Sequence, residues 1–385
     1  MSTDIRFGVV GAGYMAKMHS LALRNLTGFG WPRLPRLEMR RIADISPEAA
    51  DSAAQQWGWA STTTNWHDVT RADDIDAVII LTPNDSHCEI ATDAFRHGKH
   101  VLCEKPLANN LDSAAEMLAA FRSSNRRGMV NFVYRNWPAI QITRKLITEK
   151  RLGELLYFTG CFFQDYAADP ALPHAWRHSR AVAGSGALGD IGSHIIDIAC
   201  HLVGPIAKLS ARTSRLLPTR PDPVGRPVDV DVDDLAVLLA GFESGATGSI
   251  SAGWAMAGHK THLAFTIVGT KGTVKFDWER SNELMFYEGG AEPELEGFRR
   301  IVLGGMHPQA DMFWYAPGQG LGYAEAFTIT LRRFIESVVT GIDSSPSFDE
   351  AYLVSEVTDA ALRAAESGRW VELSAPADVG NPKRP

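Results

Sequence analysis

Short apolar runs alternate with amphipathic segments through the first third of the chain. Between the runs, apolar positions recur every three or four residues, which is typical of helices that pack by one face. The runs themselves predict β-strands at Phe7–Val10, Met39–Ala43, Ala77–Leu81, His100–Cys103 and Met129–Val133. Regular alternation of strand and helix predicts an α/β domain with a doubly wound parallel sheet, which binds ligands at the carboxyl ends of its strands.

The pattern changes after about residue 134, where strands follow one another with glycine-containing turns between them. The predicted strands are Leu155–Phe163, Leu235–Phe242, Thr247–Ala252, Leu263–Val268 and Thr273–Phe276. This order predicts an α+β domain with a large, mostly antiparallel open sheet. We therefore expect two domains, residues 1–133 and residues 134–385. The stretches 218–228 and 304–322 are longer than usual connections, which favours binding loops.

Composition and charge narrow the class of protein. With 45% hydrophobic and 22% charged residues, the 385-residue chain is close to the globular average, which excludes a disordered, collagen-like or coiled-coil protein. A net charge of -7 and a pI near 6.0 give no basic surface for neutralising phosphates. We therefore expect no nucleic-acid partner.

Cysteine usage and the N-terminal pattern bear on the compartment. The four cysteines contain no C-x-x-C pair and lie in apolar stretches, which favours a reducing compartment. The chain starts without the basic and apolar regions of a signal peptide, and no apolar stretch approaches 18 residues. The expectation is a cytoplasmic protein without a membrane partner.

A glycine-rich segment, residues 11–16, follows the first strand directly and opens an amphipathic helix. Gly11 can make the tight turn, Gly13 lets the backbone approach a pyrophosphate, and the small Ala16 lets the helix pack on the strand. In a chain with 34 glycines this pattern alone is a weak signal, and its placement after a strand strengthens it. The segment therefore predicts dinucleotide binding in a Rossmann-type domain.

Asp44 closes the second predicted strand. A carboxylate there would accept hydrogen bonds from the ribose hydroxyls and repel a 2′-phosphate, which favours NAD over NADP. Its distance from Gly13 is longer than usual, which an inserted loop at residues 29–35 would explain. The alternative is an ordinary aspartate that caps the next turn.

Lys105 and its neighbours end the fifth predicted strand, and Thr82-Pro83-Asn84 ends the fourth. Both positions fall at the sheet edge where the nicotinamide half of a cofactor would lie. A residue before proline is restricted to extended or turn geometry, and the Lys105–Pro106 bond is a candidate for cis. The alternative is an exposed lysine at a strand end. Isolated histidines such as His19, His87 and His262 are expected to satisfy local hydrogen bonds.

Asp190 and His194 lie one turn apart if a helix starts near Asp190, and Asp197 and His201 continue that face. One alternative is a solvated Asp–His pair. Another is a metal site made of Asp190, His194 and His201, in the manner of zinc-binding helices. No further cluster with ligand spacing is visible, so no resident metal is expected.

Taken together and in this order, these motifs resemble the Gfo/Idh/MocA oxidoreductase family. The motifs are the glycine loop at 9–13, Thr82-Pro83-Asn84 with His87, Glu104-Lys105-Pro106, and the segment from Gly186 through Asp190 to His194. The resemblance implies that Lys105, Asp190 and His194 form a catalytic triad. It also implies NAD or NADP as cofactor, a sugar, cyclitol or polyol as substrate, and a homodimer or homotetramer assembled through the open sheet face.

On this basis the residues expected to bind the cofactor are Gly11, Gly13, Tyr14, Met15, Asp44, Thr82, Pro83, Asn84, His87, Glu104 and Lys105. Those expected to bind the substrate are Lys105, Tyr134, Arg135, Gln164, Asp165, Trp176, Arg177, Asp190, His194 and His307.

Finer features resemble one subgroup of the family, the levoglucosan dehydrogenases, which oxidise the C3 hydroxyl of an anhydrosugar with NAD. These features are Trp31-Pro32, Gln164-Asp165-Tyr166 with Trp176-Arg177, residues 228–231, and His307-Pro308 before residues 320–323. Tyr166 and His178 depart from the subgroup's pattern.

The predicted activity is an NAD-dependent dehydrogenation of a ring secondary alcohol, at C3 of a pyranose or anhydrosugar. His194 would be the general base, Asp190 would orient it and stabilise its cation, and Lys105 would stabilise the developing alkoxide. Three alternatives stay open: an inositol dehydrogenase, a lyase or hydrolase that oxidises a sugar transiently, and a cofactor-sensing regulatory protein.

Overall fold

The computed structural model describes residues 4–28, 34–290, 292–313 and 319–373 of the chain. The predicted Trp31-Pro32 insertion lies outside the described residues. The chain folds into two compact units. The first contains residues 1–137 and 304–351, and the second contains residues 138–303 and 352–385.

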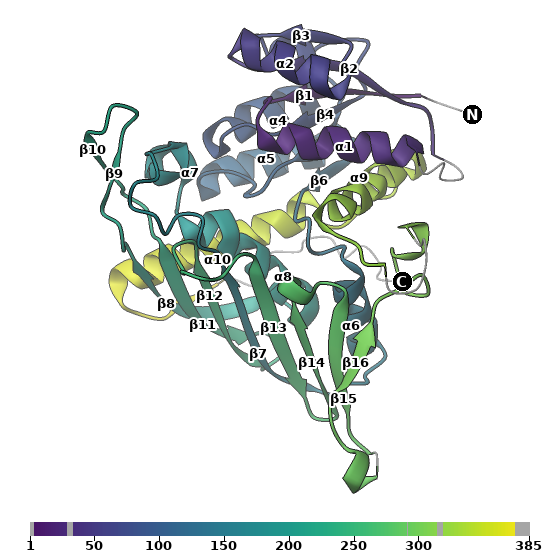
Figure 1. The fold of residues 1–385 in the computed structure, drawn as a ribbon, viewed down its shortest axis with the longest axis vertical. Coiled ribbons are helices and arrows are strands. Elements are labelled where there is room, and N and C mark those ends of the chain that lie inside the picture. Colours follow the sequence, from purple (N-terminus) through teal and green to yellow (C-terminus); the bar gives the residue numbers. More distant parts are fainter. Residues whose placement is uncertain (1–3, 29–33, 291, 314–318, 374–385) are drawn as a thin grey trace. The chain divides into compact units, whose positions relative to one another are not determined.

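A six-stranded parallel sheet forms the centre of the first unit (Figure 1). Its strands are β1 (Ile5–Val10), β2 (Leu37–Ala43), β3 (Ser61–Thr63), β4 (Ala77–Ile80), β5 (His100–Cys103) and β6 (Gly128–Val130). Their order across the sheet is β3-β2-β1-β4-β5-β6, and each pair of neighbours is parallel. This is the strand order of dinucleotide-binding Rossmann domains, so the predicted doubly wound sheet is confirmed.

The strand order reverses direction between β1 and β4. The helices of this unit are α1 (Tyr14–Gly28), α2 (Pro47–Trp57), α3 (His67–Thr70), α4 (His87–Arg96), α5 (Leu111–Ser124) and α9 (Tyr323–Thr340), with short 3₁₀ turns η1 (Asn84–Ser86) and η6 (Asp311–Phe313). Right-handed connections then require α1 and α2 to cover one face of the sheet and α4 and α5 the other. The carboxyl ends of β1 and β4 flank the reversal, which is where open α/β sheets bind ligands.

Residues 304–351 pack with the first unit, although they lie far along the chain. Helix α9 lies beside α1, with the His19 and Phe327 rings 5.1 Å apart (Figure 1). Phe348 completes an aromatic cluster with Phe95 and Phe121, with ring centroids 5.2 to 5.7 Å apart. The units therefore differ from the predicted division at residue 133, because these long-range apolar contacts leave no local signal in the sequence.

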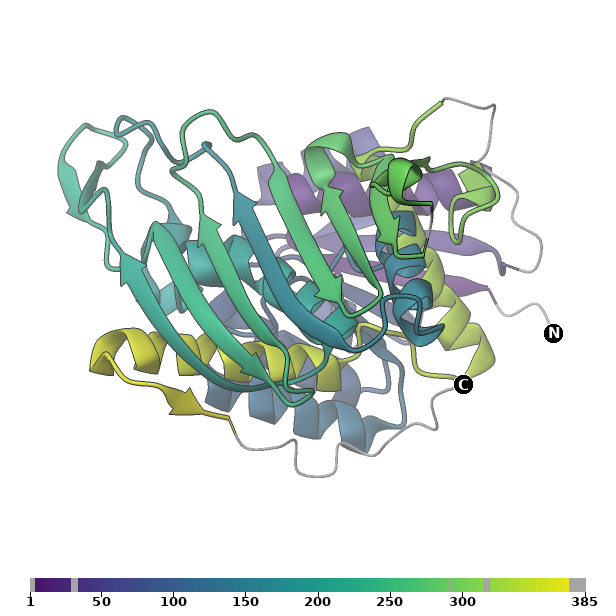
Figure 2. The same cartoon turned by 90° about the horizontal axis from the view of Figure 1, so that it is seen from below.

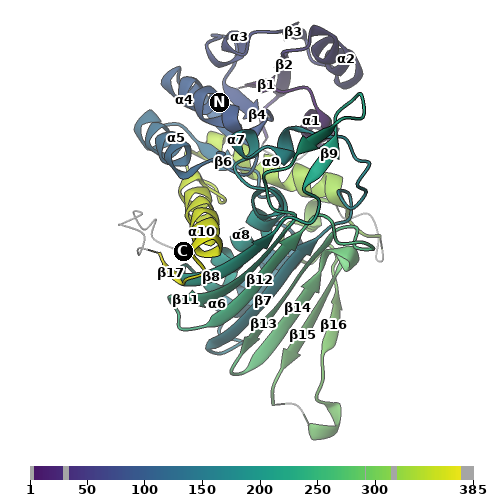
Figure 3. The same ribbon diagram turned by 90° about the vertical axis from the view of Figure 1, so that its left-hand side faces the viewer.

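A nine-stranded sheet forms the second unit. Its strands are β7 (Leu155–Phe163), β8 (Ile206–Ser214), β11 (Leu235–Phe242), β12 (Thr247–Gly253), β13 (His262–Gly269), β14 (Gly272–Asp277), β15 (Glu283–Glu288), β16 (Arg299–Val302) and β17 (Val371–Glu372). Their order is β16-β15-β14-β13-β7-β12-β11-β8-β17, as Figure 3 shows. The β7–β12 pair is parallel and the other neighbours are antiparallel, which confirms the predicted mostly antiparallel sheet.

Two of the predicted strands, Leu155–Phe163 and Leu235–Phe242, have the predicted bounds. The predicted loop at 218–228 instead contributes to a two-stranded ribbon of β9 (Thr219–Pro221) and β10 (Pro227–Asp229). The difference is explained by a turn in which the Asp222 carboxylate accepts hydrogen bonds from the backbone N–H groups of Val224 and Arg226.

Helices cover one face of the large sheet. The helices of this unit are α6 (Pro138–Thr148), α7 (Arg180–Ala183), α8 (Ser193–Val203) and α10 (Phe348–Ser367), which starts in the first unit; shorter turns are η2 (Trp176–His178), η3 (Leu188–Gly192), η4 (Trp278–Arg280) and η5 (Pro293–Leu295). Helix α8 packs on β7 and β12. A Cβ on Gly160 would lie 2.7 Å from the Ile195 side chain, so glycine is what permits this close approach. Over the described residues, no helix has the length and apolar character required to cross a bilayer.

The opposite face of the sheet carries none of the described helices, and it is turned toward the viewer in Figure 2. Side chains alternate accordingly along the strands. On β7, Phe158 and Phe162 are buried while Tyr157 is 40% exposed, and on β11 Val237 and Leu239 are 42% and 53% exposed. The sheet thus presents a partly apolar surface to its surroundings.

The cluster around Phe348 makes a prediction about stability. We expect Phe348→Ala to lower the melting temperature, because removing a fully buried phenylalanine costs about 3 to 5 kcal/mol. Thermal unfolding followed by circular dichroism measures the shift. Ile342→Ala is the matched control, because Ile342 lies in the same segment and is 71% exposed. Equal melting temperatures for the two variants would contradict the packing of this segment.

Candidate active site

The glycine loop of the first unit has the geometry of a pyrophosphate cradle. Gly11 has a φ of +103°, and a Cβ there would lie 2.9 Å from the carbonyl of Leu81. A Cβ on Gly13 would meet no atom within 4 Å, so the backbone is open to a ligand at that point. Ala16 is fully buried beneath the loop, where α1 begins. The free N–H groups of this helix start are suited to a negatively charged pyrophosphate.

Asp44 follows β2 and lies against the glycine loop. Its Oδ2 accepts a hydrogen bond from the Ala12 N–H at 2.7 Å, and its Oδ1 accepts one from the Ser46 N–H at 2.9 Å. The carboxylate therefore fixes the loop relative to the turn before α2. The next residue, Ile45, is 93% exposed and supplies no positive charge for a 2′-phosphate. The geometry fits NAD. Asp44 is the predicted ribose partner, and it also holds the glycine loop in place.

His87 connects the two strand-end loops that follow β4 and β5. Its ring nitrogens lie 3.0 Å from the Thr82 carbonyl oxygen and 3.1 Å from that of Pro106. Burial lowers the pKa of His87, and this outweighs the carbonyls, which favour the cation. The Lys105–Pro106 bond is cis, as the sequence suggested. The contacts of His87 position these loops, and its predicted role in cofactor binding remains a prediction.

A buried hydrogen-bond network contacts the Lys105 backbone. Glu104 Oε1 is 2.9 Å from His19 Nε2 and accepts a hydrogen bond from Asn131 Nδ2 at 2.6 Å. Glu104 Oε2 accepts the Lys105 N–H at 3.3 Å. The side chains of His19, Glu104 and Asn131 are buried, so the network is shielded from water.

Competing influences act on the pKa of Glu104. Burial alone raises it, but the hydrogen bonds from His19 and Asn131 and the charges of His19 and Lys105 outweigh burial, so the pKa is below its usual value. The ionised carboxylate joins α1 to the ends of β5 and β6. Local hydrogen bonds were expected for His19, but its partners in this network are 85 and 112 positions away, so the network could not be inferred from the sequence.

In the second unit, a π-helical turn, η3, carries Asp190. The Asp233 carboxylate holds its start by accepting the N–H groups of Gly186 and Leu188, both at 2.8 Å. A Cβ on Gly186 would lie 1.9 Å from the Asp233 carbonyl oxygen, so this position requires glycine. Burial raises the pKa of Asp233 against the effect of these N–H groups. The helix therefore starts before the predicted position near Asp190, in a widened turn of the kind often found at functional sites.

The side chains of Tyr166 and Arg177 contact the Asp190 carboxylate. The Tyr166 hydroxyl donates to Oδ2 at 2.8 Å, and Arg177 Nε lies 3.6 Å from Oδ1. The Arg177 guanidinium also lies over the Trp176 ring, 4.2 Å from its centroid. Burial and the neighbouring Asp190 charge raise the pKa of Tyr166, which keeps it a donor. Tyr166 was noticed in the sequence as part of Gln164-Asp165-Tyr166 and as a departure from the subgroup's pattern, and its contact with Asp190 could not be inferred there.

His194 is the second residue of α8 and is 6% exposed, with its ring 5.9 Å from that of Phe162. Over the described residues, Asp190, His194 and His201 are not among the groups whose ligand atoms converge as a metal site requires. The alternative metal site drawn from the sequence therefore has no support in the geometry.

Several predicted substrate residues have other partners. Arg135 is 2% exposed, and its guanidinium donates to Ser345 Oγ at 2.8 Å and to the Glu350 carboxylate. Asp165 is paired with Lys260 Nζ at 2.6 Å. Arg135 is thus part of the structure of the first unit, and we no longer assign it to substrate.

The remaining predicted residues are divided between the units. In the first, Tyr134 is 5% exposed, and His307 Nδ1 accepts the Gly304 N–H at 2.9 Å within a tight turn. In the second, the Gln164 backbone joins β7 to the segment after β12 through Gly253 and Met256. For Tyr134, Gln164 and His307, substrate binding stays a prediction.

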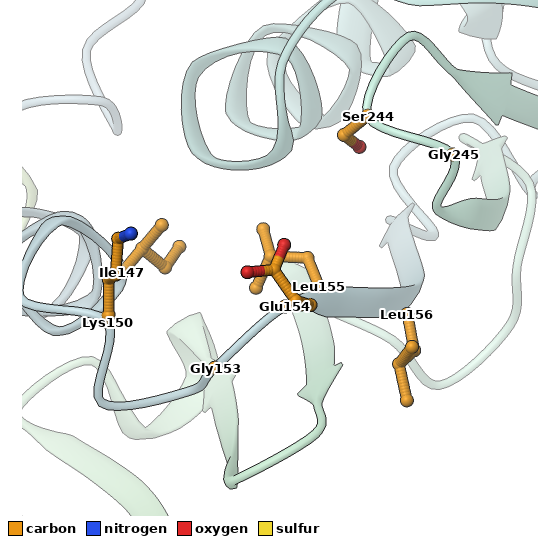
Figure 4. Close-up of a pocket in the computed structure, with 8 residues that line it drawn as sticks. All are labelled: Ile147, Lys150, Gly153, Glu154, Leu155, Leu156, Ser244 and Gly245. Carbon is orange, nitrogen blue, oxygen red and sulfur yellow. The ribbon is translucent and has the colours of Figure 1, made fainter.

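A cavity of about 480 Å³ lies in the second unit, at the start of β7 (Figure 4). Lys150 and Glu154 lie on one side of it, and Ser244 and Gly245 of the β11–β12 turn lie on the other. No predicted site residue lines this cavity. It therefore does not add to the candidate active site.

A Rossmann unit whose glycine loop is suited to a dinucleotide, together with a second unit that carries the Asp190 turn, defines an NAD-dependent oxidoreductase. Residues 5–132 match the family described as "Oxidoreductase family, NAD-binding Rossmann fold", and residues 140–275 match the "GFO/IDH/MocA C-terminal domain". The chain belongs to the Gfo/Idh/MocA oxidoreductase family.

Individual relatives agree with this placement. Levoglucosan dehydrogenase of Pseudarthrobacter phenanthrenivorans is 37% identical, over 96% of this chain and 98% of that protein. Inositol 2-dehydrogenase of Rhizobium meliloti is 27% identical over 96% of this chain and 99% of its own length. A solved structure of levoglucosan dehydrogenase in complex with NADH and levoglucosan has a TM-score of 0.94 at 37% identity, covering 97% of this chain and 100% of that chain.

The network around Glu104 makes a pH-dependent prediction. Glu104→Gln should lower the melting temperature at neutral pH, because a buried hydrogen-bonded carboxylate is replaced by a group that cannot accept the same bonds. The folded-state pKa of Glu104 is lowered, so its contribution is present above the unfolded value of about 4.3 and is lost as the pH falls through the folded-state value. The difference between variant and parent should therefore shrink in strong acid.

Melting temperatures of both proteins across a series of buffers from neutral into strong acid, down to about pH 2, test this prediction. Glu116→Gln is the control, because Glu116 is an exposed residue of α5. A pH-independent difference would show that charge on Glu104 does not stabilise the fold.

Proposed function

We propose that this protein oxidises a ring secondary alcohol, at C3 of a pyranose or anhydrosugar such as levoglucosan, with NAD⁺ as the hydride acceptor. The observation that carries the proposal is the presence of Lys105, Asp190 and His194, the family's triad by motif, in a chain that aligns over nearly its whole length with a levoglucosan dehydrogenase. A cofactor-sensing protein would not need to keep these three residues.

Each residue of the triad has a distinct role in the proposed reaction. His194 takes the proton of the reacting hydroxyl, and Lys105 donates a hydrogen bond to the same oxygen as negative charge develops on it. The bound nicotinamide supplies the acceptor for the hydride that leaves the carbon. Products are the keto sugar, NADH and one proton, which passes from His194 to solvent.

Asp190 tunes His194 in this scheme. Asp190 and His194 lie one turn apart in a continuous helical run, η3 followed by α8, and the negative charge of Asp190 would stabilise the His194 cation as it forms. Tyr166 and Arg177 contact the Asp190 carboxylate and would hold it in position.

The arginines support an uncharged substrate. Arg135 is paired with Glu350, and Arg177 is placed between Asp190 and the Trp176 ring. Guanidinium groups that already have carboxylate partners are poor receptors for a substrate phosphate.

We also propose that the protein works in the cytoplasm as a homo-oligomer. The free thiols of Cys88, Cys103, Cys161 and Cys200 support a reducing compartment. The uncovered sheet face, with Tyr157, Val237 and Leu239 exposed, supports association through that face.

The triad variants test the mechanism. Lys105→Ala and His194→Ala should each lower kcat by about a hundredfold or more, while the dissociation constant for NADH changes little, because both groups act on the reacting oxygen. Stopped-flow absorbance gives kcat, and NADH fluorescence titration gives binding. Lys150→Ala, which alters a lysine of the separate cavity, is the control. Full activity in either triad variant would refute the assignment.

A substrate comparison tests the class of sugar. We expect kcat/KM for levoglucosan or a methyl glucoside to exceed that for a sugar phosphate, because the arginines are already paired. A tenfold preference for the phosphate, about 1.4 kcal/mol, would overturn the substrate class. The same assay with myo-inositol tests the inositol alternative. Steady formation of NADH separates a dehydrogenase from a sensor, which forms none, and from a lyase, which returns the hydride.

A further inference from the structure

We propose that His262, Asp277 and Glu279 form a binding site for Zn²⁺ on the second unit, with His259 packed beside them. His262 is the first residue of β13, Asp277 is the last residue of β14, and Glu279 lies in the turn η4. None of the four is a predicted cofactor or substrate residue. The proposal does not depend on the proposed dehydrogenase activity.

The strand register explains why these residues meet. Strands β13 and β14 are antiparallel, with Ala264 opposite Asp277. The pairing ends at this pair, two residues after His262, and the turn η4 follows Asp277 directly. The turn brings a carboxylate oxygen of Glu279 within 4.8 Å of ligand atoms of His262 and Asp277. An imidazole and two carboxylates are thus gathered at one end of the β13–β14 hairpin, whose strands are adjacent in Figure 3.

The distances suit a small divalent cation. His262 Nδ1 lies 3.2 Å from Asp277 Oδ1. One ligand atom from each of His262, Asp277 and Glu279 lies within 4.8 Å of the others, and over the described residues this is the group with that property. Zinc bonds of about 2.0 to 2.2 Å place neighbouring tetrahedral ligands about 3.3 Å apart. The His262–Asp277 pair already has this spacing, and a Glu279 carboxylate oxygen lies within 4.8 Å of both ligand atoms.

Backbone contacts hold the carboxylates in place. Glu279 Oε1 accepts the N–H groups of Lys260 and Thr261 at 3.0 and 3.2 Å. Asp277 Oδ1 accepts the Glu279 N–H at 3.0 Å. Each hydrogen bond uses one oxygen of its carboxylate. The remaining lone pairs of the carboxylate can bind a metal ion.

Aromatic rings pack around His262. The His259 ring is stacked on that of His262 with centroids 4.9 Å apart, and the Phe163 ring lies 5.6 Å from His259 and 6.4 Å from His262. These contacts limit the movement of the His262 imidazole. An imidazole nitrogen with two carboxylate oxygens is a donor set that zinc accepts, whereas magnesium and calcium prefer oxygen alone.

The simpler account is that Asp277 only caps η4 and hydrogen-bonds His262, with no metal involved. Direct binding separates the two accounts. Full-length protein without an affinity tag is treated with a chelator, dialysed and titrated with ZnCl₂ by isothermal calorimetry, with metal content measured after gel filtration. We expect one zinc per chain, a higher melting temperature with zinc, and no comparable binding of Mg²⁺.

Three variants locate the site. His262→Ala, Asp277→Asn and Glu279→Gln should each weaken zinc binding tenfold or more. Glu279 is exposed, so Glu279→Gln keeps the test valid if another variant fails to fold. The matched control is His97→Ala, because His67 and His97 also lie near a carboxylate, Asp93, at 3.6 and 3.5 Å, yet fall outside the convergent group. Absence of stoichiometric zinc, equal zinc affinity in the three site variants, or loss of binding in His97→Ala would overturn the proposal.

Discussion

The buried carboxylate of Glu104 is the interaction on which the order of the first unit's ligand-binding edge depends. Hydrogen bonds to His19 and Asn131 join the helix that follows the glycine loop to the ends of two strands. Because a buried carboxylate without partners is very costly, these three elements have one favourable arrangement. Lys105 follows Glu104 in the chain and donates its N–H to the Glu104 carboxylate. Its backbone is therefore held by the same network that holds the helix after the glycine loop.

In the second unit, two consecutive aspartates fix backbone segments by accepting their N–H groups. Asp233 accepts the N–H groups at the start of the Asp190 turn, while Asp234 accepts those of Leu216 and Leu217 and the Trp254 indole N–H. Both are buried. Lys105 and the Asp190 turn therefore each lie next to a buried carboxylate that accepts backbone N–H groups.

Much of the fold and part of the candidate site could be predicted from local sequence patterns, since strands of alternating or continuous apolar residues and a glycine loop after a strand are local features. Contacts between residues far apart in the sequence could not be predicted in this way. The last predicted strand of the first domain was too long at Val133, because Asn131 leaves the sheet after Val130 to bind Glu104. The contact between Tyr166 and Asp190, and the pairing of Arg135 with Glu350, join residues 24 and 215 positions apart. Local periodicity carries no information about such pairs.

The parallel pairing of β7 with β12 has a consequence for how the protein folds. Partners in this pair, such as Thr159 and Ser249, are 90 positions apart, and the intervening chain contains Tyr166, Trp176, Asp190 and His194. Closing so long a loop carries an entropic cost before any contact of the pair is gained, so pairings of this kind form slowly. During synthesis on the ribosome, β12 also emerges long after β7. The Asp190 turn should therefore reach its final form only when the centre of the sheet closes, which makes catalytic competence a late event in folding.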